Sequence, residues 1–215
     1  VQFYFNDNYQ KESGTGASSV FVSTFVGAVV GVLFLAAINR FDFSLTPFAL
    51  TWSFITAINS VLCSICSLKA LEKVNLSVYS LFTMLGGMML PFIAGLAFYN
   101  ESMTVAKAIC VAFVTAALLI TINWNKKTGG ELYYFGIFIL NGMSGVLSKI
   151  YESAEFSKGS SGGYSLWVSV MSVAISLVAL IIIGKRVKEP SFRAILFSAG
   201  GGILNRIANF LLLIS

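Results

Sequence analysis

Residues 76–99 constrain the fold most, because these 24 residues are apolar and carry no formal charge. At about 1.5 Å per residue, a helix of this length spans roughly 36 Å, enough to cross a bilayer core about 30 Å thick. Pro91 removes a backbone hydrogen bond and clashes with the preceding turn. We therefore predict a membrane helix that bends near Gly87 and Pro91. The face that these two residues share with Gly95 is expected to pack beside a polar stripe at residues 52–66.

The composition extends this prediction to the whole chain. Hydrophobic residues make up 57% of it and charged residues 11%, whereas soluble domains carry about 25% charge. The net charge of +5 is spread over short loops, so it does not indicate a nucleic-acid partner. We expect an all-α, polytopic helix bundle, with the lipid bilayer as a partner, in the plasma membrane as a multi-pass protein.

Six further apolar runs complete the predicted set of spans. They cover residues 20–38, 48–68, 105–122, 132–150, 164–184 and 194–215. Residues 1–9 are typical of the polar end of an earlier helix, and residues 10–19 of a Gly/Ser-rich loop. The last run has no cap or stop signal. We therefore expect a fragment, truncated at both ends.

An internal repeat with a period near 147 residues is the second organising pattern. The matching pairs are Tyr4/Tyr151, Lys11/Lys158, Ser13/Ser160, Gly16/Gly163 and Ser18/Ser165. One period would contain five helices, and an odd number places the second copy in the membrane upside down, as in many secondary transporters. The predicted repeats are 1–125, with its first helix mostly missing, and 126–215, with its last two helices missing.

Two segments also resemble a known family. The sequences ALEKVNLSVYSL (70–81) and GGMMLPFIAGLAFYNESMT (86–104), with LNGMSG at 140–145, are similar to the EamA-like branch of the drug/metabolite transporter superfamily. The motifs cover about forty residues. This resemblance implies ten helices around a central substrate cavity and alternating access between two bundles.

Two patterns predict helix packing. Gly27 and Gly31 form a GxxxG face that lets two helix backbones approach closely. A stripe of Trp52, Thr56, Asn59, Cys63 and Cys66 recurs at helical spacing and should face inward. The spacing Cys63-x-x-Cys66 also occurs in redox and metal half-sites. Because the chain has no histidine and no second such pair, we interpret both thiols as packing groups and predict neither a metal nor a cofactor.

Polar side chains inside spans are costly, so they line a pathway or bond a partner. The candidate substrate-binding residues are Asn59, Asn141, Asn205, Arg206 and Asn209. Asn59 and Asn205 correspond approximately under the repeat, and either could hold a polar metabolite or bond one helix to another. Three interpretations of Arg206 stay open: contact with an anionic substrate group or a gate, a structural ion pair, or a position near the surface.

Two charged residues near helix ends have other expected roles. Lys149 should extend to the membrane interface, with a cavity role as the alternative. Glu101 should favour the start of the following helix, with proton coupling as the alternative. The positive-inside rule assigns the more basic set of loops to the cytoplasm, whereas the family resemblance implies the reverse, so the orientation stays open.

The expected function is a secondary transporter of small metabolites, by export or uptake. An enzyme is not expected, because the chain has no histidine and no paired carboxylates. The alternative is a structural or lipid-handling membrane protein without transport activity. Expected partners are a small-molecule substrate and the bilayer, and a homodimer is left open.

Overall fold

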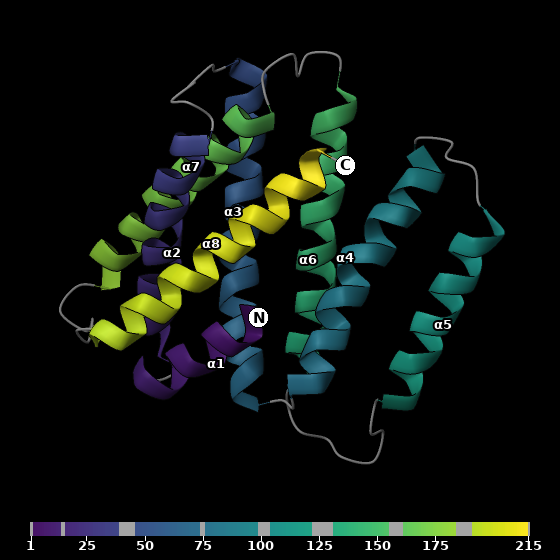
Figure 1. The fold of residues 1–215 in the computed structure, drawn as a ribbon, viewed down its shortest axis with the longest axis horizontal. Coiled ribbons are helices and arrows are strands. Elements are labelled where there is room, and N and C mark those ends of the chain that lie inside the picture. Colours follow the sequence, from purple (N-terminus) through teal and green to yellow (C-terminus); the bar gives the residue numbers. More distant parts are fainter. Residues whose placement is uncertain are drawn as a thin grey trace.

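The computed structural model describes residues 2–13, 16–38, 46–73, 76–98, 104–121, 131–154, 161–183 and 191–214. This part of the chain forms eight helices and contains no strand, which confirms the all-α fold (Figure 1). The helices are α1 (Gln2–Ser13), α2 (Ala17–Ile38), α3 (Pro47–Lys73), α4 (Leu76–Phe98), α5 (Val105–Thr121), α6 (Glu131–Ser153), α7 (Ser161–Ile183) and α8 (Phe192–Ile214).

Each of the seven predicted spans corresponds to one helix, but the predicted loop at residues 10–19 is too long, because helices occupy both of its ends. Helix α1 continues to Ser13, and α2 begins at Ala17. The hydroxyl of the buried Tyr9 donates to the carbonyl of Ser19 at 2.6 Å. The side-chain amide of Gln10 donates to the carbonyl of Leu68 at 2.5 Å. These contacts fix α1 against its neighbours, and local composition does not reveal them.

Four helices are long and apolar enough to cross a membrane. The qualifying segments are Ser18–Ile38, Pro47–Leu71, Val78–Phe98 and Gly162–Ile183. Helix α5 has 17 described residues and is too short for this criterion. Helices α6 and α8 also contain apolar stretches, but they do not qualify within the described residues. The membrane character predicted from the sequence is therefore carried by α2, α3, α4 and α7.

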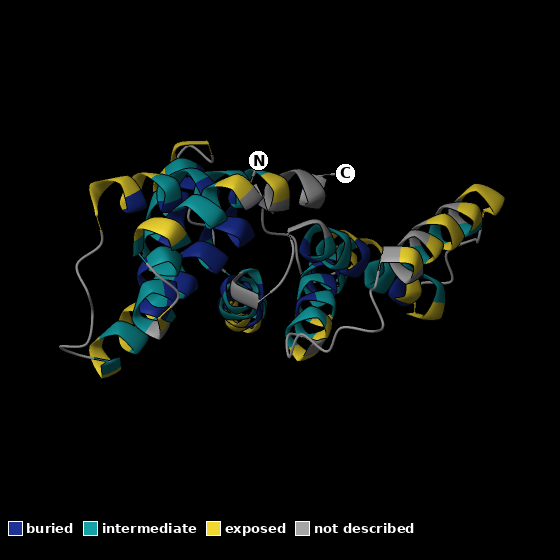
Figure 2. Ribbon diagram, turned by 90° about the horizontal axis from the view of Figure 1, so that it is seen from below, coloured by how far each residue is buried: buried dark blue, intermediate teal, exposed yellow. Residues whose placement is uncertain are grey.

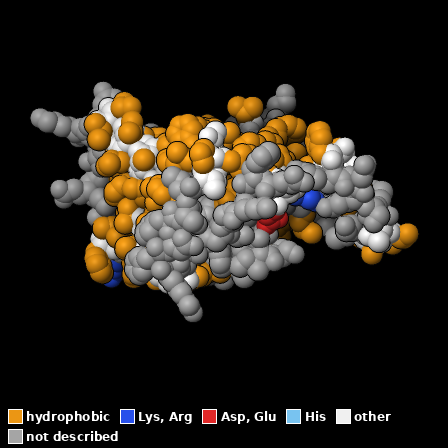
Figure 3. Space-filling model, turned by 90° about the horizontal axis from the view of Figure 1, so that it is seen from above, with side chains coloured by type: hydrophobic (Ala, Val, Ile, Leu, Met, Phe, Trp, Pro, Cys, Tyr) orange, Lys and Arg blue, Asp and Glu red, His pale blue; other side chains and the backbone are white. Residues whose placement is uncertain are grey.

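The distribution of side chains on α3 is the reverse of that in a water-soluble bundle. Its buried side chains include Ser53, Thr56 and Asn59, whereas Phe54 and Leu62 are nearly half exposed. Apolar side chains also cover much of the face that Figure 3 shows for the described residues. Water disfavours this arrangement, and a hydrocarbon solvent favours it, because polar groups are then satisfied inside the protein.

The helices pack in two groups that α3 connects. In the first group, α2 packs against α7 and α8, and α1 packs against α8. In the second group, α4 packs against α6, and α5 lies at the edge beside α4 (Figures 1 and 2). Helix α3 packs against α6 on one side and α7 on the other.

The α2–α8 interface depends on glycines, as the GxxxG pattern predicted. A Cβ atom on Gly202 would collide with the backbone of Gly27. One turn away in either direction, Gly31 lies against the side chain of Arg206, and Ser23 hydrogen-bonds Ser198 at 3.0 Å between their hydroxyl oxygens. The two helices are thus in contact at three consecutive levels.

The α4–α6 interface is equally close and corrects one prediction. A Cβ atom on Gly86 would collide with the carbonyl of Phe138, and one on Gly145 would collide with the ring of Pro91. Gly87 lies beside Asn141: a Cβ atom added to Gly87 would be 3.0 Å from the side-chain nitrogen of Asn141. The expectation that Gly87 and Pro91 pack beside the polar stripe of α3 is therefore wrong, because α6 occupies that position.

The substitution Gly202→Ala is expected to separate α2 from α8. Its methyl group would meet backbone atoms of Gly27, which cannot rotate away. Such overpacking costs about 1–3 kcal/mol. The measurement is the thermal unfolding midpoint of the purified protein in mild detergent.

Gly201→Ala is the matched control, because its Cβ would lie 3.4 Å from the Cβ of Phe5, an ordinary contact. Equal unfolding midpoints for Gly202→Ala and Gly201→Ala would contradict the close approach of α2 and α8.

Candidate functional site

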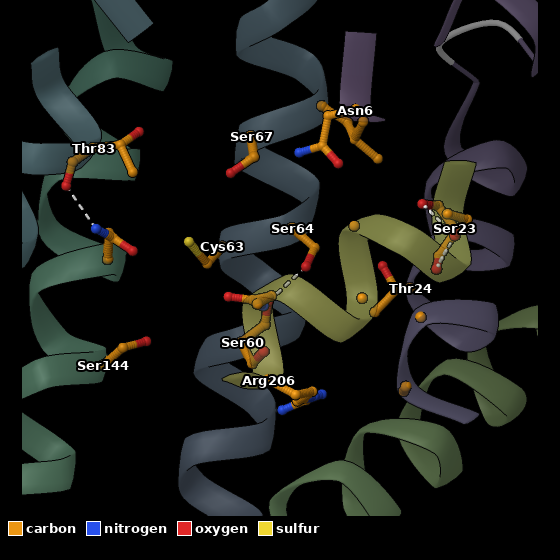
Figure 4. A pocket seen from close by; sticks show the side chains of 18 of the residues that line it. Asn6, Ser23, Thr24, Ser60, Cys63, Ser64, Ser67, Thr83, Ser144 and Arg206 are labelled. Atoms are coloured by element: carbon orange, nitrogen blue, oxygen red, sulfur yellow. Dashed lines mark hydrogen bonds between the residues drawn. The ribbon is translucent and has the colours of Figure 1, made fainter. Parts of the chain in front are cut away.

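A cavity of about 140 Å³ lies among α1, α2, α3, α4, α6 and α8. Its wall is made mainly of hydroxyl, amide and thiol side chains from helices far apart in the sequence (Figure 4). The polar members are Asn6, Ser23, Thr24, Ser60, Cys63, Ser64, Ser67, Tyr79, Thr83, Asn141, Ser144, Ser198, Asn205 and Arg206. Among the described residues of this wall, Arg206 alone carries a formal charge.

Arg206 is held at one end of this cavity by α2. Arg206 is 7% exposed, so it is buried among the helices and does not lie on the outer face of the bundle. Its stem lies on Gly31, where an added Cβ would be 2.8 Å from Cγ and 3.2 Å from Nε. Within the described part of the chain, no carboxylate lies within 4.0 Å of the guanidinium. The expected structural ion pair is therefore not formed by those residues.

A second, smaller cavity of about 30 Å³ adjoins the first at Arg206. Ser60, Ser144 and Arg206 belong to both walls. On its far side the second cavity is lined by Thr56 and Tyr164, whose hydroxyl oxygens are 2.7 Å apart in a buried hydrogen bond. Arg206 thus lies between two polar spaces.

Stacked aromatic rings lie beyond the second cavity. The rings of Tyr151 and Tyr164 stack with centroids 3.8 Å apart, and Phe48 stacks on Tyr151 at 6.0 Å. With Ala49 and Val168, the two tyrosines form a buried cluster that joins α3, α6 and α7. We call Phe48, Tyr151 and Tyr164 the aromatic layer.

Asn59 is used for helix packing in this structure. Its side-chain nitrogen donates to the carbonyl of Leu140 and to the hydroxyl of Ser144, both at 2.9 Å and both on α6. Asn59 lines neither of the two cavities. Of the two interpretations left open by the sequence, this geometry favours the helix-to-helix bond.

The other candidate residues have different positions. Asn141 and Asn205 line the larger cavity, and the side-chain nitrogen of Asn141 donates to the carbonyl of Thr83 at 2.6 Å. Asn209 lies on α8, but its side chain is outside the described residues, and Glu101 is outside them altogether. The site therefore brings together Asn141, Asn205 and Arg206.

The inward orientation predicted for the stripe on α3 is confirmed. The indole of Trp52 donates to the carbonyl of Leu147 at 2.9 Å, and the Thr56 hydroxyl bonds Tyr164. Cys63 lines the larger cavity. Cys66 lies three residues further along the same face, and its sulfur is 3.4 Å from a Cβ atom built on Gly136 of α6. Both thiols are free.

The serines and threonines of the larger cavity were not among the predicted site residues. Ser60, Ser64 and Ser67 follow each other at spacings of four and three residues, one position after the stripe on α3. Ser165, Ser169, Ser172 and Ser176 on α7 show the same periodicity and are all buried. Hydroxyl periodicity within apolar runs was the available signal, since such a stripe marks an inward face.

Comparison with known proteins gives no assignment. No protein-family model matches the chain, and no curated protein matches it.

Asn59→Leu is expected to lower stability while leaving the wall of the larger cavity intact. The change keeps the side-chain size and removes both hydrogen bonds to α6, and such bonds between membrane helices contribute about 0.6–2 kcal/mol each. The measurement is the unfolding midpoint in detergent, with Ser64→Ala as the control, because the Ser64 hydroxyl bonds only its own helix, at the carbonyl of Ser60. A midpoint for Asn59→Leu that equals the control would contradict this role.

Proposed function

We propose that this protein is a multi-pass transporter of the plasma membrane that moves small polar metabolites by alternating access. The observation that carries the proposal is a polar cavity enclosed by helices whose outer surfaces are apolar. Polar groups inside a membrane domain are costly and typically mark a pathway for a polar substrate. The resemblance of residues 70–104 to EamA-like transporters agrees with this function.

The packing of the helices supports an inverted repeat. An offset near 147 residues pairs α1 with α6, α2 with α7, and α3 with α8. Under this pairing, the α1–α8 contact corresponds to α6–α3, and the α2–α8 contact corresponds to α7–α3. Helices α2 and α7 correspond to each other and are also in contact. Such reciprocity is expected when repeats 1–125 and 126–215 are related by a pseudo-two-fold axis.

Two adjoining cavities that share Ser60, Ser144 and Arg206 suit alternating access. The substrate would occupy the larger cavity at Arg206 and leave through the space now limited by the Thr56–Tyr164 bond. Opening that path requires the aromatic layer to separate. A carrier of this kind needs no reaction chemistry, and the described wall offers no pair of carboxylates for acid–base catalysis.

Ser144→Cys tests the carrier proposal, because Ser144 belongs to both cavity walls. In a background with Cys63, Cys66 and Cys110 changed to serine, a membrane-impermeant thiol reagent should modify this cysteine from either side of the membrane. The measurement compares labelling in right-side-out and inside-out vesicles.

Leu33→Cys is the control, because Leu33 is 66% exposed on the apolar outer surface and its thiol would face lipid, where ionisation is disfavoured. Labelling of Ser144→Cys from one side only would favour the structural or lipid-handling alternative.

A further inference from the structure

We infer that the larger cavity selects a small hydroxylated monocarboxylate, whose carboxylate binds Arg206 and whose hydroxyl groups bind the opposite wall. This inference rests on the proposed function and assigns its substrate class. Three properties of the cavity support it: its charge, its hydrogen-bonding pattern and its volume.

The charge of the cavity favours an anion. A guanidinium removed from water loses its hydration, and this cost is offset only when an opposite charge and hydrogen-bond acceptors replace the water. Arg206 is only 7% exposed, and the described residues place no carboxylate beside it. Its planar fork matches a carboxylate with two parallel hydrogen bonds. The ligand would therefore supply the missing negative charge.

Three hydroxyl groups of the wall are positioned to act as hydrogen-bond acceptors. The hydroxyls of Thr24, Ser64 and Thr83 each donate their single hydrogen to a carbonyl of their own helix, at 2.9, 3.0 and 2.9 Å respectively. A hydroxyl whose hydrogen is already used can only accept a further bond. These three residues come from α2, α3 and α4 and surround the cavity (Figure 4). They suit a ligand that carries hydroxyl donors.

The same wall disfavours cations and zwitterions. An ammonium group brought into the cavity would lose its hydration, and no aspartate or glutamate belongs to the described wall to compensate it. A neutral hydroxyl group has a much smaller desolvation cost. An α-hydroxy acid should therefore bind better than the corresponding α-amino acid.

The volume limits the size of the ligand. The cavity measures about 140 Å³, close to an engineered 150 Å³ protein cavity that holds one benzene molecule. A ligand of roughly six to eight non-hydrogen atoms fits such a space. Acids with three or four carbon atoms have this size.

D-Glycerate is the probe for this inference, and binding to the purified full chain in lipid nanodiscs is the measurement. Three compounds of similar size each differ from glycerate in one respect: glycerol has no charge, propionate has no hydroxyl group, and serine has an ammonium group in place of the α-hydroxyl group. Inorganic phosphate tests whether any small anion suffices. We expect glycerate to bind at least tenfold more tightly than each of the four.

Arg206→Gln should weaken glycerate binding at least tenfold, because the side chain keeps hydrogen-bond donors but loses its charge. Arg193→Gln is the matched control: Arg193 lies on the same helix and is exposed, so its replacement should leave binding unchanged. Ser64→Ala provides a second variant that removes only an acceptor. It should reduce the preference for glycerate over propionate several-fold and leave propionate binding unaltered.

Three results would overturn the inference. They are equal binding of glycerate and serine, tighter binding of phosphate than of glycerate, and glycerate binding that Arg206→Gln does not weaken. If Arg206→Gln does not fold, an unchanged preference in Ser64→Ala also overturns it. Failure of the carrier proposal is distinguishable: glycerate would then bind in nanodiscs, with its dependence on Arg206, but would not enter proteoliposomes. Conversely, uptake of serine that is insensitive to Arg206→Gln would keep the carrier and reject this substrate class.

Discussion

Polar groups among apolar helices have no water to bond, and this constraint accounts for most of the structure. A buried donor must find an acceptor on its own helix or on a neighbour. Asn59 meets this requirement by bonding α6, and Thr24 by bonding its own backbone. The guanidinium of Arg206 has no carboxylate partner among the described residues. An anionic ligand in the larger cavity would supply this missing negative charge.

Glycines determine where Arg206 can lie. Because Gly27 and Gly202 bring α2 and α8 into backbone contact, the next turn of α8 is pressed against α2 as well. The stem of Arg206 lies in the space that Gly31 leaves free, and Arg206 lines both cavities. A larger residue at position 31 would displace the charge without changing it. Helix packing and site geometry are thus set by the same residues.

The helices were predictable from the sequence because polar segments separate the apolar runs. The inward stripe of α3 was predictable because its spacing follows one helix face. The helices that pack against these faces were not predictable. The stripe is bonded by α6 and α7, and Pro91 lies on Gly145 of α6, although neither neighbour is signalled by local spacing. Likewise, Asn59 and Asn205 have similar positions in the proposed repeat but different surroundings. Which amide lines a cavity depends on tertiary contacts alone.

The hydrogen bonds of α3 indicate how the proposed carrier would open. On one side, α3 is tied to α6 by the indole of Trp52 and by both bonds of Asn59. On the other side, a hydrogen bond between the hydroxyls of Thr56 and Tyr164 joins α3 to α7. Separation of α3 from α7 would therefore break fewer of these side-chain hydrogen bonds among the described residues than separation of α3 from α6. It would also open the smaller cavity, which Thr56 and Tyr164 line. We accordingly expect α3 to move with α6, while Arg206 stays with the group formed by α1, α2, α7 and α8. Each transport cycle would then separate Arg206 from Ser60 and Ser144 and bring these residues together again.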